Sequence, residues 1–289
     1  DMVKASKADS VSVRPFQAPP TPFNVEISGS RRFASQSYSL ARFKRIGEMA
    51  GATVNDVTLA ICAGALRKYL EAHNALPAKP LIAMVPVSLH GEGEGGGNQV
   101  SLLLANLATD VRDPLKRLQR IVQSTSEAKA RLSTMPRLQK MAHGVTSISP
   151  MGASIVTGSA KEHPLFNLVI SNVPGSKTDL YLNGARLDEV YPVSIVTHYQ
   201  ALNITISGYG DNLGFGYIAC RRSLPNLQRM LDYTDSAIQE LEAALNIESA
   251  SPVAPRNAAK PRKAVLAKSP APKPAKAKSA AAKPATTRA

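Results

Sequence analysis

The sequence predicts an α/β domain in which long helices cover a mixed β-sheet. Two apolar runs of strand length, at residues 80–89 and 100–109, precede a second group of strand-like runs between residues 166 and 221. Helical patterns occupy much of the chain between and beyond these runs. Because helices and strands do not alternate strictly, the pattern does not indicate a Rossmann fold.

Two helices are predicted before the first strand-like run. Residues 39–50 have a short amphipathic pattern that Gly51 ends. Thr53, followed three residues later by Asp56, predicts an N-cap close to a capping box. The pattern that starts there, residues 53–74, is apolar nearly all round over its first three turns, so we expect this helix to be buried.

The sequence signals that start the later helices differ in strength. Asp113 at a cap position and Pro114 in the first turn begin a helix over residues 113–132. A second helical piece is expected within residues 135–158, and an amphipathic helix follows Ser223.

The strand-like runs differ in what separates them. The first two are joined by a glycine-rich loop, residues 90–99, which no GKS or GKT follows, so it does not indicate a phosphate-binding loop. The GDNLG sequence at 210–214 predicts a tight turn between two strands. The later runs are residues 166–173, 179–200 and 201–221.

Composition divides the chain into four parts. Residues 1–30 are predicted to be a largely disordered linker, and a chain that opens on a linker indicates a piece of something longer. Residues 31–75 are predicted to be connecting helices, and residues 76–248 a C-terminal domain. Residues 249–289 form a tail of Lys, Ala and Pro that is expected to be disordered, because it cannot bury enough apolar surface.

The excess of positive charge is mostly a property of this tail. Residues 251–289 hold ten of the 35 Lys and Arg residues and no acid, so the remainder of the chain has a net charge of only +4. The tail is interpreted either as a solubilising segment or as an electrostatic attachment to anionic phospholipid or nucleic acid. No aromatic residue lies between the lysines, which argues against stacking on single-stranded nucleic acid.

Cysteine usage and hydropathy exclude several classes of protein. Cys62 and Cys220 lie far apart and form no CxxC motif, so no metal or redox site is predicted, and a reducing cytosol is compatible. No apolar run reaches the roughly 18 residues of a membrane span, and the sequence predicts no signal peptide. We therefore expect a cytoplasmic protein, at most peripherally attached to the inner membrane or to lipid inclusions.

The motif SNVPGS follows a strand-like run. Pro174 and Gly175 suit the central positions of a type II turn, in which Gly takes a positive φ. The strand is then expected to stop with Ser171 and Asn172 at its end, where a hydroxyl and an amide can orient a substrate oxygen or stabilise an oxyanion. The alternative, which spacing alone favours, is that both side chains satisfy backbone groups of the turn.

No motif in the sequence identifies a general base or a nucleophile. Acyl transfer to an alcohol requires a base that titrates near working pH, usually a histidine. The five histidines are isolated from one another, none is followed by a downstream Asp-Gly, and there is no GxSxG nucleophile elbow. Each is interpreted as a surface or satisfied core histidine: His73, His90, His143, His163 and His198.

Three blocks of the sequence together resemble one family. They are RRFASQSYSLARFKRIGEMAGATVNDVTLAICAGALRKYL, FNLVISNVPGS and LYLNGARL. In combination they resemble the bacterial wax ester synthase/acyl-CoA:diacylglycerol acyltransferase family over residues 31–245. The resemblance implies a fold similar to one half of a chloramphenicol acetyltransferase-like, CoA-dependent acyltransferase, in which two α/β domains enclose a substrate tunnel.

The resemblance also implies a reaction. It is the transfer of a fatty acyl group from acyl-CoA to diacylglycerol, giving triacylglycerol, or to a long-chain alcohol, giving a wax ester. Acyl-CoA is then a substrate, and no metal or redox cofactor is implied. The family's base is the second histidine of an HHxxxDG motif, which this chain lacks. The chain therefore looks like the second domain with its connecting segment, and a catalytic half is expected in cis or in trans.

Site residues carry over from the family's three motifs, and none of them is the catalytic base. The ND pair is implied to be structural or near the active site, and SNVPG to lie near the acyl or alcohol channel. Ser176 stands where the family often has Pro. The candidates are Asn55, Asp56, Ser171, Asn172, Val173, Pro174, Gly175, Tyr181, Asn183 and Gly184, with Leu182 and Ala185 in the third motif.

Three functional hypotheses follow, in this order. The first is the tunnel half of an O-acyltransferase that works only with its catalytic half. The second is a non-catalytic protein that binds lipid, granules or an anionic surface and has a basic tail. The third is an association with nucleic acid, which would be non-specific and driven by the tail.

Overall fold

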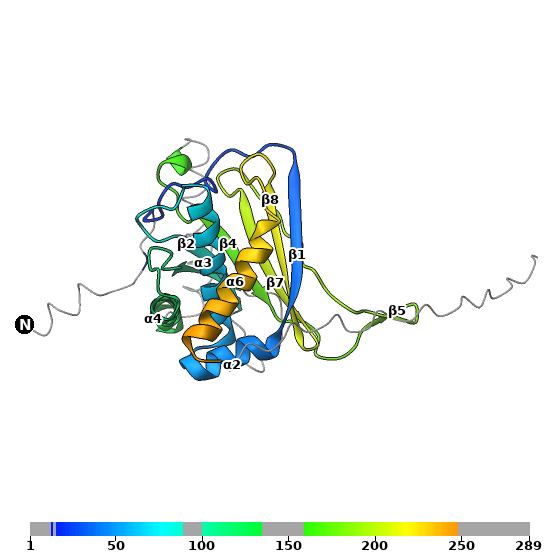
Figure 1. Ribbon diagram of the computed structural model, residues 1–289. Coiled ribbons are helices and arrows are strands. Elements are labelled where there is room, and N and C mark those ends of the chain that lie inside the picture. The colour runs from blue at the N-terminus through cyan, green and yellow to red at the C-terminus, as the bar shows by residue number, and fades with distance from the viewer. Residues whose placement is uncertain (1–12, 14–15, 89–99, 135–158, 248–289) are drawn as a thin grey trace, which may run out of the picture. The chain divides into compact units, whose positions relative to one another are not determined.

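The computed structural model describes residues 13, 16–88, 100–134 and 159–247, and the fold is an α/β sandwich of two layers. The chain divides into two units, residues 1–249 and residues 250–289, and all described residues belong to the first. A six-stranded sheet forms one layer, and the helices lie on one of its faces (Figure 1). The long helices are α2 (Leu40–Ala50), α3 (Val54–Ala72), α4 (Pro114–Thr134) and α6 (Arg229–Ala244).

The sheet is mixed, in the order β1-β8-β7-β4-β2-β3. Its strands are β1 (Arg31–Ser39), β2 (Ile82–Ser88), β3 (Val100–Asn106), β4 (Leu168–Val173), β7 (Leu202–Tyr209) and β8 (Asn212–Cys220). Strand β4 pairs in parallel with both β2 and β7, and the remaining pairs are antiparallel. Strands β1, β2, β4 and β7 therefore run in one direction and end at the same edge of the sheet.

Strand β1 corrects the prediction that residues 31–75 are only connecting helices. Its nine residues pair antiparallel with all of β8, from Arg31 with Cys220 to Ser39 with Asn212. The partner strand is about 180 residues away in sequence, so no local pattern announces the pairing. Because β1 is an edge strand of the same sheet, the structure does not divide the body at residue 75.

Residues 16–30 were predicted as part of a linker, but they pack on the body through two buried asparagines. Asn24 donates from Nδ2 to the carbonyl oxygens of Phe166 and Tyr199, each at 3.1 Å. Asn167 donates to the carbonyl of Pro19 at 2.7 Å and to Oδ1 of Asn24 at 2.9 Å. These bonds satisfy both buried amides, which would otherwise carry a desolvation cost, and they attach the segment to the starts of the central strands.

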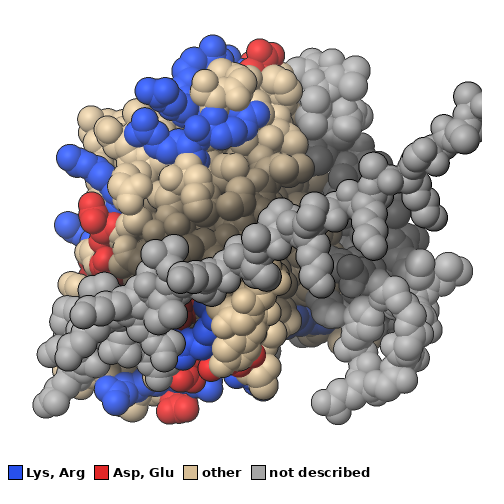
Figure 2. All heavy atoms as spheres, turned by 90° about the vertical axis from the view of Figure 1, so that its right-hand side faces the viewer, with Lys and Arg blue, Asp and Glu red and all other residues tan. Residues whose placement is uncertain are grey.

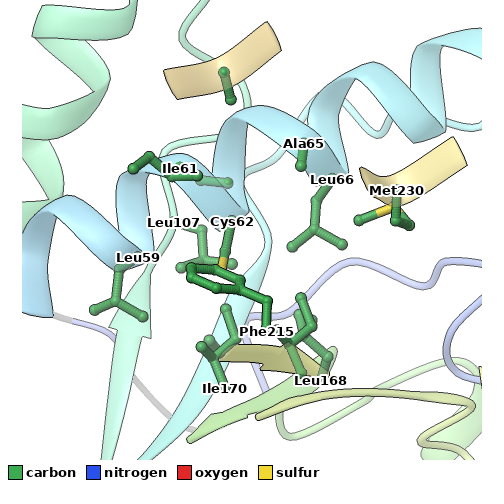
Figure 3. Close-up of a cluster of buried hydrophobic side chains, with 14 of the residues drawn as sticks. Leu59, Ile61, Cys62, Ala65, Leu66, Leu107, Leu168, Ile170, Phe215 and Met230 are labelled. Carbon is green, nitrogen blue, oxygen red and sulfur yellow. The ribbon is translucent and has the colours of Figure 1, made fainter. Parts of the chain in front are cut away.

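Helix α3 is the centre of the hydrophobic core, as its all-round apolar pattern predicts. Figure 3 shows Leu59, Cys62 and Leu66 pointing from α3 towards Leu168 and Ile170 on β4 and Phe215 on β8. Each large apolar side chain that is fully buried in this way contributes roughly 1.5–3 kcal/mol relative to exposure. The core therefore holds the helices against one face of the sheet and leaves the other face without a helical layer.

The predicted helix ends are confirmed. Gly51 has a left-handed φ of 64° and ends α2, and Thr53 and Asp56 form both bonds of a capping box at the start of α3. Oδ1 of Asp113 accepts from the amide of Lys116 at 2.8 Å, which caps α4.

Strands were correctly predicted at 80–89 and 100–109, and GDNLG forms the turn between β7 and β8, with Gly210 at φ 54°. The glycine-rich loop, the helical piece predicted within 135–158 and the basic tail lie outside the described residues. Of the described helices, none alone has the length and apolarity of a bilayer span; α2 and α3 meet both criteria only as a pair, bent by 101°.

Candidate functional site

The SNVPG motif lies at the sheet edge where four strands end. β4 carries Ser171, Asn172 and Val173 to this edge, and β1 leads there directly into α2. Helix α3 begins at the same end, because Leu59 in its second turn lies beside Ile170, whereas Leu66 lies nearer Leu168 (Figure 3). The structure therefore brings the ND and SNVPG motifs to one end of the domain.

Ser171 and Asn172 point to opposite faces of the sheet. The strand ends at Val173, so Ser171 and Asn172 lie near its end as predicted, with Ser171 opposite Thr205 and Asn172 opposite Ile206. Side chains alternate along a strand, so Asn172 shares the helix-covered face with Ile170, and Ser171 lies on the uncovered face. Both are half-buried, and neither has a side-chain hydrogen bond to another described residue.

Gly175 is needed for a close approach and not for a type II turn. Its φ is not positive, which corrects the predicted turn geometry. A β-carbon at this position would lie 1.6 Å from the carbonyl oxygen of Gly208 on β7. The motif therefore continues in close contact with the end of β7, where the carbonyl of Ser176 accepts from the amide of Gly210 at 3.0 Å.

The third motif forms a projecting β-hairpin. Strands β5 (Tyr181–Leu182) and β6 (Ala185–Arg186) pair across Asn183 and Gly184, whose φ angles of 50° and 79° are those of a type I′ turn. Tyr181, Asn183 and Gly184 are all exposed. The Asn-Gly pair is a strong hairpin signal that our sequence prediction did not use.

Tyr209 anchors the hairpin, a role that no motif of the sequence indicates. Its hydroxyl donates to the carbonyl of Leu187 at 2.8 Å and accepts from the amide of Leu180 at 3.0 Å. The amide of Leu187 in turn donates to the carbonyl of Leu180 at 2.8 Å. These bonds close the base of the hairpin onto the last residue of β7, next to the SNVPG motif.

The segment after the hairpin crosses the uncovered face of the sheet. Two glycines of β8 make room for it, since a β-carbon on Gly214 would lie 2.0 Å from the carbonyl oxygen of Val190, and one on Gly216 1.9 Å from that of Pro192. Figure 2 looks onto this side of the molecule and shows a broad middle band without charged side chains. The segment adds exposed apolar side chains, among them Val193 and Ile195, to that band.

Asp56 has a structural role. Its Oδ2 accepts from the amide of Thr53 at 3.2 Å and from the Thr53 hydroxyl at 2.6 Å, and its Oδ1 accepts from the hydroxyl of Thr125 on α4 at 2.7 Å. Asp56 is 3 % exposed, and both of its carboxylate oxygens accept from these donors. The ND pair was expected either to be structural or to lie near the active site, and the geometry of Asp56 favours the structural role. Asn55 beside it is half-buried.

The histidines of the described residues lie at the other end of the sheet. His73 ends α3, where its ring stacks on Tyr69 with centroids 4.3 Å apart. His163 precedes β4, and His198 precedes β7 and accepts from the amide of Ile27 at 3.3 Å. His90 and His143 lie outside the described residues. None of the three described histidines is placed to act as a base at the SNVPG edge.

An open cleft lies away from the SNVPG edge, and the described residues form no metal site. An open cleft of about 490 Å³ lies at the opposite end, and its lining includes Pro20, Ala75 and Lys161. Over the described ranges, no group of three or more His, Cys, Asp or Glu side chains is placed to hold a metal ion.

Family sequence models match most of the chain. The model of the WS/DGAT C-terminal domain matches residues 96–242, just over half of the chain. The model of the wax ester synthase/diacylglycerol acyltransferase catalytic domain matches residues 1–58.

Individual relatives agree with these matches. The chain is 47% identical over 233 residues to O-acyltransferase WSD of Acinetobacter baylyi, covering 81% of this chain and 51% of that protein. It is 47% identical over 249 residues to a probable diacylglycerol O-acyltransferase of Mycobacterium tuberculosis, covering 85% and 55%. The chain thus spans about half the length of the relatives that it matches.

Solved structures show the same fold. The wax ester synthase/diacylglycerol acyltransferase of Marinobacter aquaeolei VT8 superposes with a TM-score of 0.72 at 44% identity, covering 79% of this chain and 53% of that one. A structure that shows condensation domain-mediated chain release from the enacyloxin polyketide synthase superposes with a TM-score of 0.51 at 12% identity. It covers 84% of this chain and 47% of that one, and at this identity it supports the fold alone. The predicted acyltransferase-like fold is confirmed, and the chain belongs to the wax ester synthase/diacylglycerol acyltransferase family.

Proposed function

We propose that this chain is one half of an O-acyltransferase of neutral lipid synthesis. The complete enzyme transfers a fatty acyl group from acyl-CoA to diacylglycerol, forming triacylglycerol, or to a long-chain alcohol, forming a wax ester. The observation that carries the proposal is the match of the family's C-terminal domain to residues 96–242, together with the coverage of only about half of each relative. The other half, which holds the HHxxxDG motif, supplies the base.

In this reaction the proton transfers are carried out by the other half and not by this chain. The histidine of the other half removes the proton of the acceptor hydroxyl, and the alkoxide oxygen attacks the thioester carbonyl. The tetrahedral intermediate collapses, the carbon–sulfur bond breaks, and CoA leaves as a thiol after it receives the proton from the histidine. Acyl-CoA enters as a substrate, and no further cofactor is required by these steps.

The uncovered side of this half supports docking of the catalytic half. Most of the large apolar side chains that are exposed in the described part of the chain, seven of ten, lie between residues 173 and 195, where they are 39–78% exposed. They are Val173, Leu180, Tyr181, Leu182, Tyr191, Val193 and Ile195. Apolar side chains gathered in this way mark an interaction site, and the proposed partner is the rest of the family's catalytic domain.

Asn172 is the residue of this half that we propose to hold the reacting groups. Its carboxamide lies near the end of β4 and has no hydrogen-bond partner among the described residues, so it is free to donate to a substrate oxygen. In the reconstituted enzyme we expect Asn172→Ala to lower kcat by about 10-fold or more. Unchanged turnover in this variant would remove Asn172 from the proposal.

The proposed location follows from the substrates and the tail. Diacylglycerol and long-chain alcohols reside in membranes and lipid inclusions, so we place the protein in the cytoplasm, at the periphery of the inner membrane or of such inclusions. The ten basic residues of 251–289 favour an anionic surface. Nucleic acid would bind only non-specifically through the same charges.

The test measures CoA release from palmitoyl-CoA with hexadecanol or diacylglycerol. Three samples are compared: residues 1–289 alone, a separately expressed half that carries HHxxxDG, and the two mixed. We expect turnover only in the mixture. Turnover by this chain alone would contradict the division of labour, and His163 and His198 would be the first residues to replace.

The second candidate is a lipid-binding protein without catalysis. It is favoured by one observation, the position of all three described histidines at the end opposite the motif. Lipid binding that persists after deletion of residues 251–289, with no turnover beside an active catalytic half, would support this candidate over the first.

A further inference from the structure

Four arginines lie at the corner of the sheet where β1 begins and β8 ends, with Arg31 and Arg32 on opposite faces of β1. Arg31 is paired with Cys220, the last residue of β8, so Arg221 and Arg222 follow at the same corner as Arg31 and Arg32. The amide of Arg221 donates to the carbonyl of Ser30 at 3.1 Å, which fixes the two segments to each other. The corner is far from the SNVPG edge, since β1 has nine residues at about 3.3 Å each, or roughly 30 Å.

The partners of these four arginines differ from those of five other arginines of the domain. Arg42, Arg67, Arg117, Arg120 and Arg186 each form an ion pair with a carboxylate. Within the described part of the chain, no carboxylate lies within ion-pair distance of the four corner arginines, which are all exposed. Their recorded side-chain bonds go to backbone carbonyls, from Arg31 to Ser28 and Ser30, and from Arg222 to Glu26.

The charge distribution on the uncovered side is uneven. Figure 2 shows Lys and Arg side chains gathered at its upper end with little acidic colour, whereas basic and acidic side chains are interspersed at its lower end. The carboxylate recorded near the corner belongs to Glu26, and it accepts from the hydroxyl of Tyr199 at 3.4 Å. The corner is therefore a concentrated positive charge beside a face that carries few charges.

We propose that this corner, Arg31, Arg32, Arg221 and Arg222, binds the phosphate groups of the acyl-CoA donor. The inference rests on the proposed acyltransferase function. Guanidinium groups donate in a planar fork that matches phosphate oxygens. CoA carries a pyrophosphate and a 3′-phosphate at one end and the thioester at the other. With the phosphates at the corner, the pantetheine arm and acyl chain extend over the uncovered face towards the SNVPG edge.

The test compares two acyl donors that differ only in the phosphates, palmitoyl-CoA and palmitoyl-pantetheine. The variants are Arg31→Gln/Arg32→Gln and Arg221→Gln/Arg222→Gln, assayed as the full chain mixed with the catalytic half. We expect KM for palmitoyl-CoA to rise about tenfold or more in each double variant. KM for palmitoyl-pantetheine, and kcat for both donors, are expected to stay unchanged.

The matched control is Lys44→Gln/Arg45→Gln. These two residues are exposed on α2, at the other end of β1, so the variant removes the same charge far from the corner. We expect its KM values to equal those of the wild type. The KM of the wild type for palmitoyl-CoA is also expected to rise with salt, and this dependence is expected to be weaker in the corner variants.

Binding of adenosine 3′,5′-bisphosphate to the full chain alone separates this inference from the proposed function. If the mixture fails to turn over either donor while the corner variants still weaken this binding, the proposed function fails and the phosphate site stands. Equal rises in KM for both donors would overturn the phosphate site. Loss of binding to phosphatidylglycerol vesicles with an unchanged KM for palmitoyl-CoA would assign the corner to lipid headgroups and overturn the CoA assignment.

Discussion

Gly175 lies directly against the backbone of Gly208, with no room for a side chain between them. A β-carbon on Gly175 would lie 1.6 Å from the carbonyl oxygen of Gly208 and 3.5 Å from its α-carbon. The crowding is one-sided, because a β-carbon on Gly208 would meet its nearest atom, the amide nitrogen of Gly175, at 3.6 Å. The SNVPG motif thus contains a glycine because of a neighbouring strand.

Gly175→Ala is expected to push the segment after β4 away from β7. The overlap cannot be relieved by a side-chain rotation, since the atom that is met belongs to the backbone. We expect a loss of about 1–3 kcal/mol in the free energy of unfolding, measured by urea denaturation. Gly208→Ala is the matched control and is expected to change stability far less; equal effects of the two variants would contradict the close approach.

Tyr209→Phe is expected to loosen the hairpin without unfolding the domain. The change removes the hydroxyl that bonds both Leu180 and Leu187, at about 1 kcal/mol per bond, while the ring stays in place. We expect faster hydrogen exchange at the amides of Leu180 and Leu187 and unchanged exchange in α3. Tyr181→Phe is the control, since that side chain is 64% exposed, and the same acceleration in it would rule out anchoring by Tyr209.

Asp56→Ala is expected to reduce stability and not the chemical step. The carboxylate caps α3 and bonds Thr125 on α4, so we expect a loss of about 2–4 kcal/mol in the free energy of unfolding. A double-mutant cycle with Thr125→Val measures the link between the helices and should give a coupling of roughly 1 kcal/mol or more. A variant of full stability that has lost turnover would return Asp56 to the active site.

Cys220 is expected to make stability depend on pH. Burial opposes its ionisation, but hydrogen bonds involving Ser223 and Ser28 outweigh burial and lower the pKa of the thiol from 9.0 to about 6. The folded state then favours the thiolate, so Cys220 adds stability as pH rises from about 6 towards 9.0, and this contribution is lost as pH falls through about 6.

The measurement for Cys220 is the difference in urea midpoint between the wild type and Cys220→Ala, which should be larger near pH 8.5 than near pH 6. Cys62→Ala is the control, because burial raises the pKa of Cys62 to about 12 and this thiol stays protonated over the same range. A difference for Cys220→Ala that does not vary with pH would contradict the expectation.

Local interactions determined what the sequence alone could predict. The capping box of Thr53 and Asp56 joins residues three apart, Gly51 ends a helix through its own φ, and the all-round apolar pattern of α3 makes it a core helix wherever it packs. The Asn183-Gly184 turn is of the same kind, since positive φ at both positions follows from residue type. The combination of three motifs also sufficed to indicate the family.

Tertiary structure decided the features that depend on residues distant in sequence. The pairing of β1 with β8 joins residues about 180 apart, and it converts a predicted connecting segment into an edge strand. The same pairing assembles the arginine corner, which no spacing in the sequence reveals. The faces taken by Ser171 and Asn172 and the role of Tyr209 as an anchor likewise depend on the register of β4 and β7. Register is set by the packing of whole strands against α3, and no single segment contains that information.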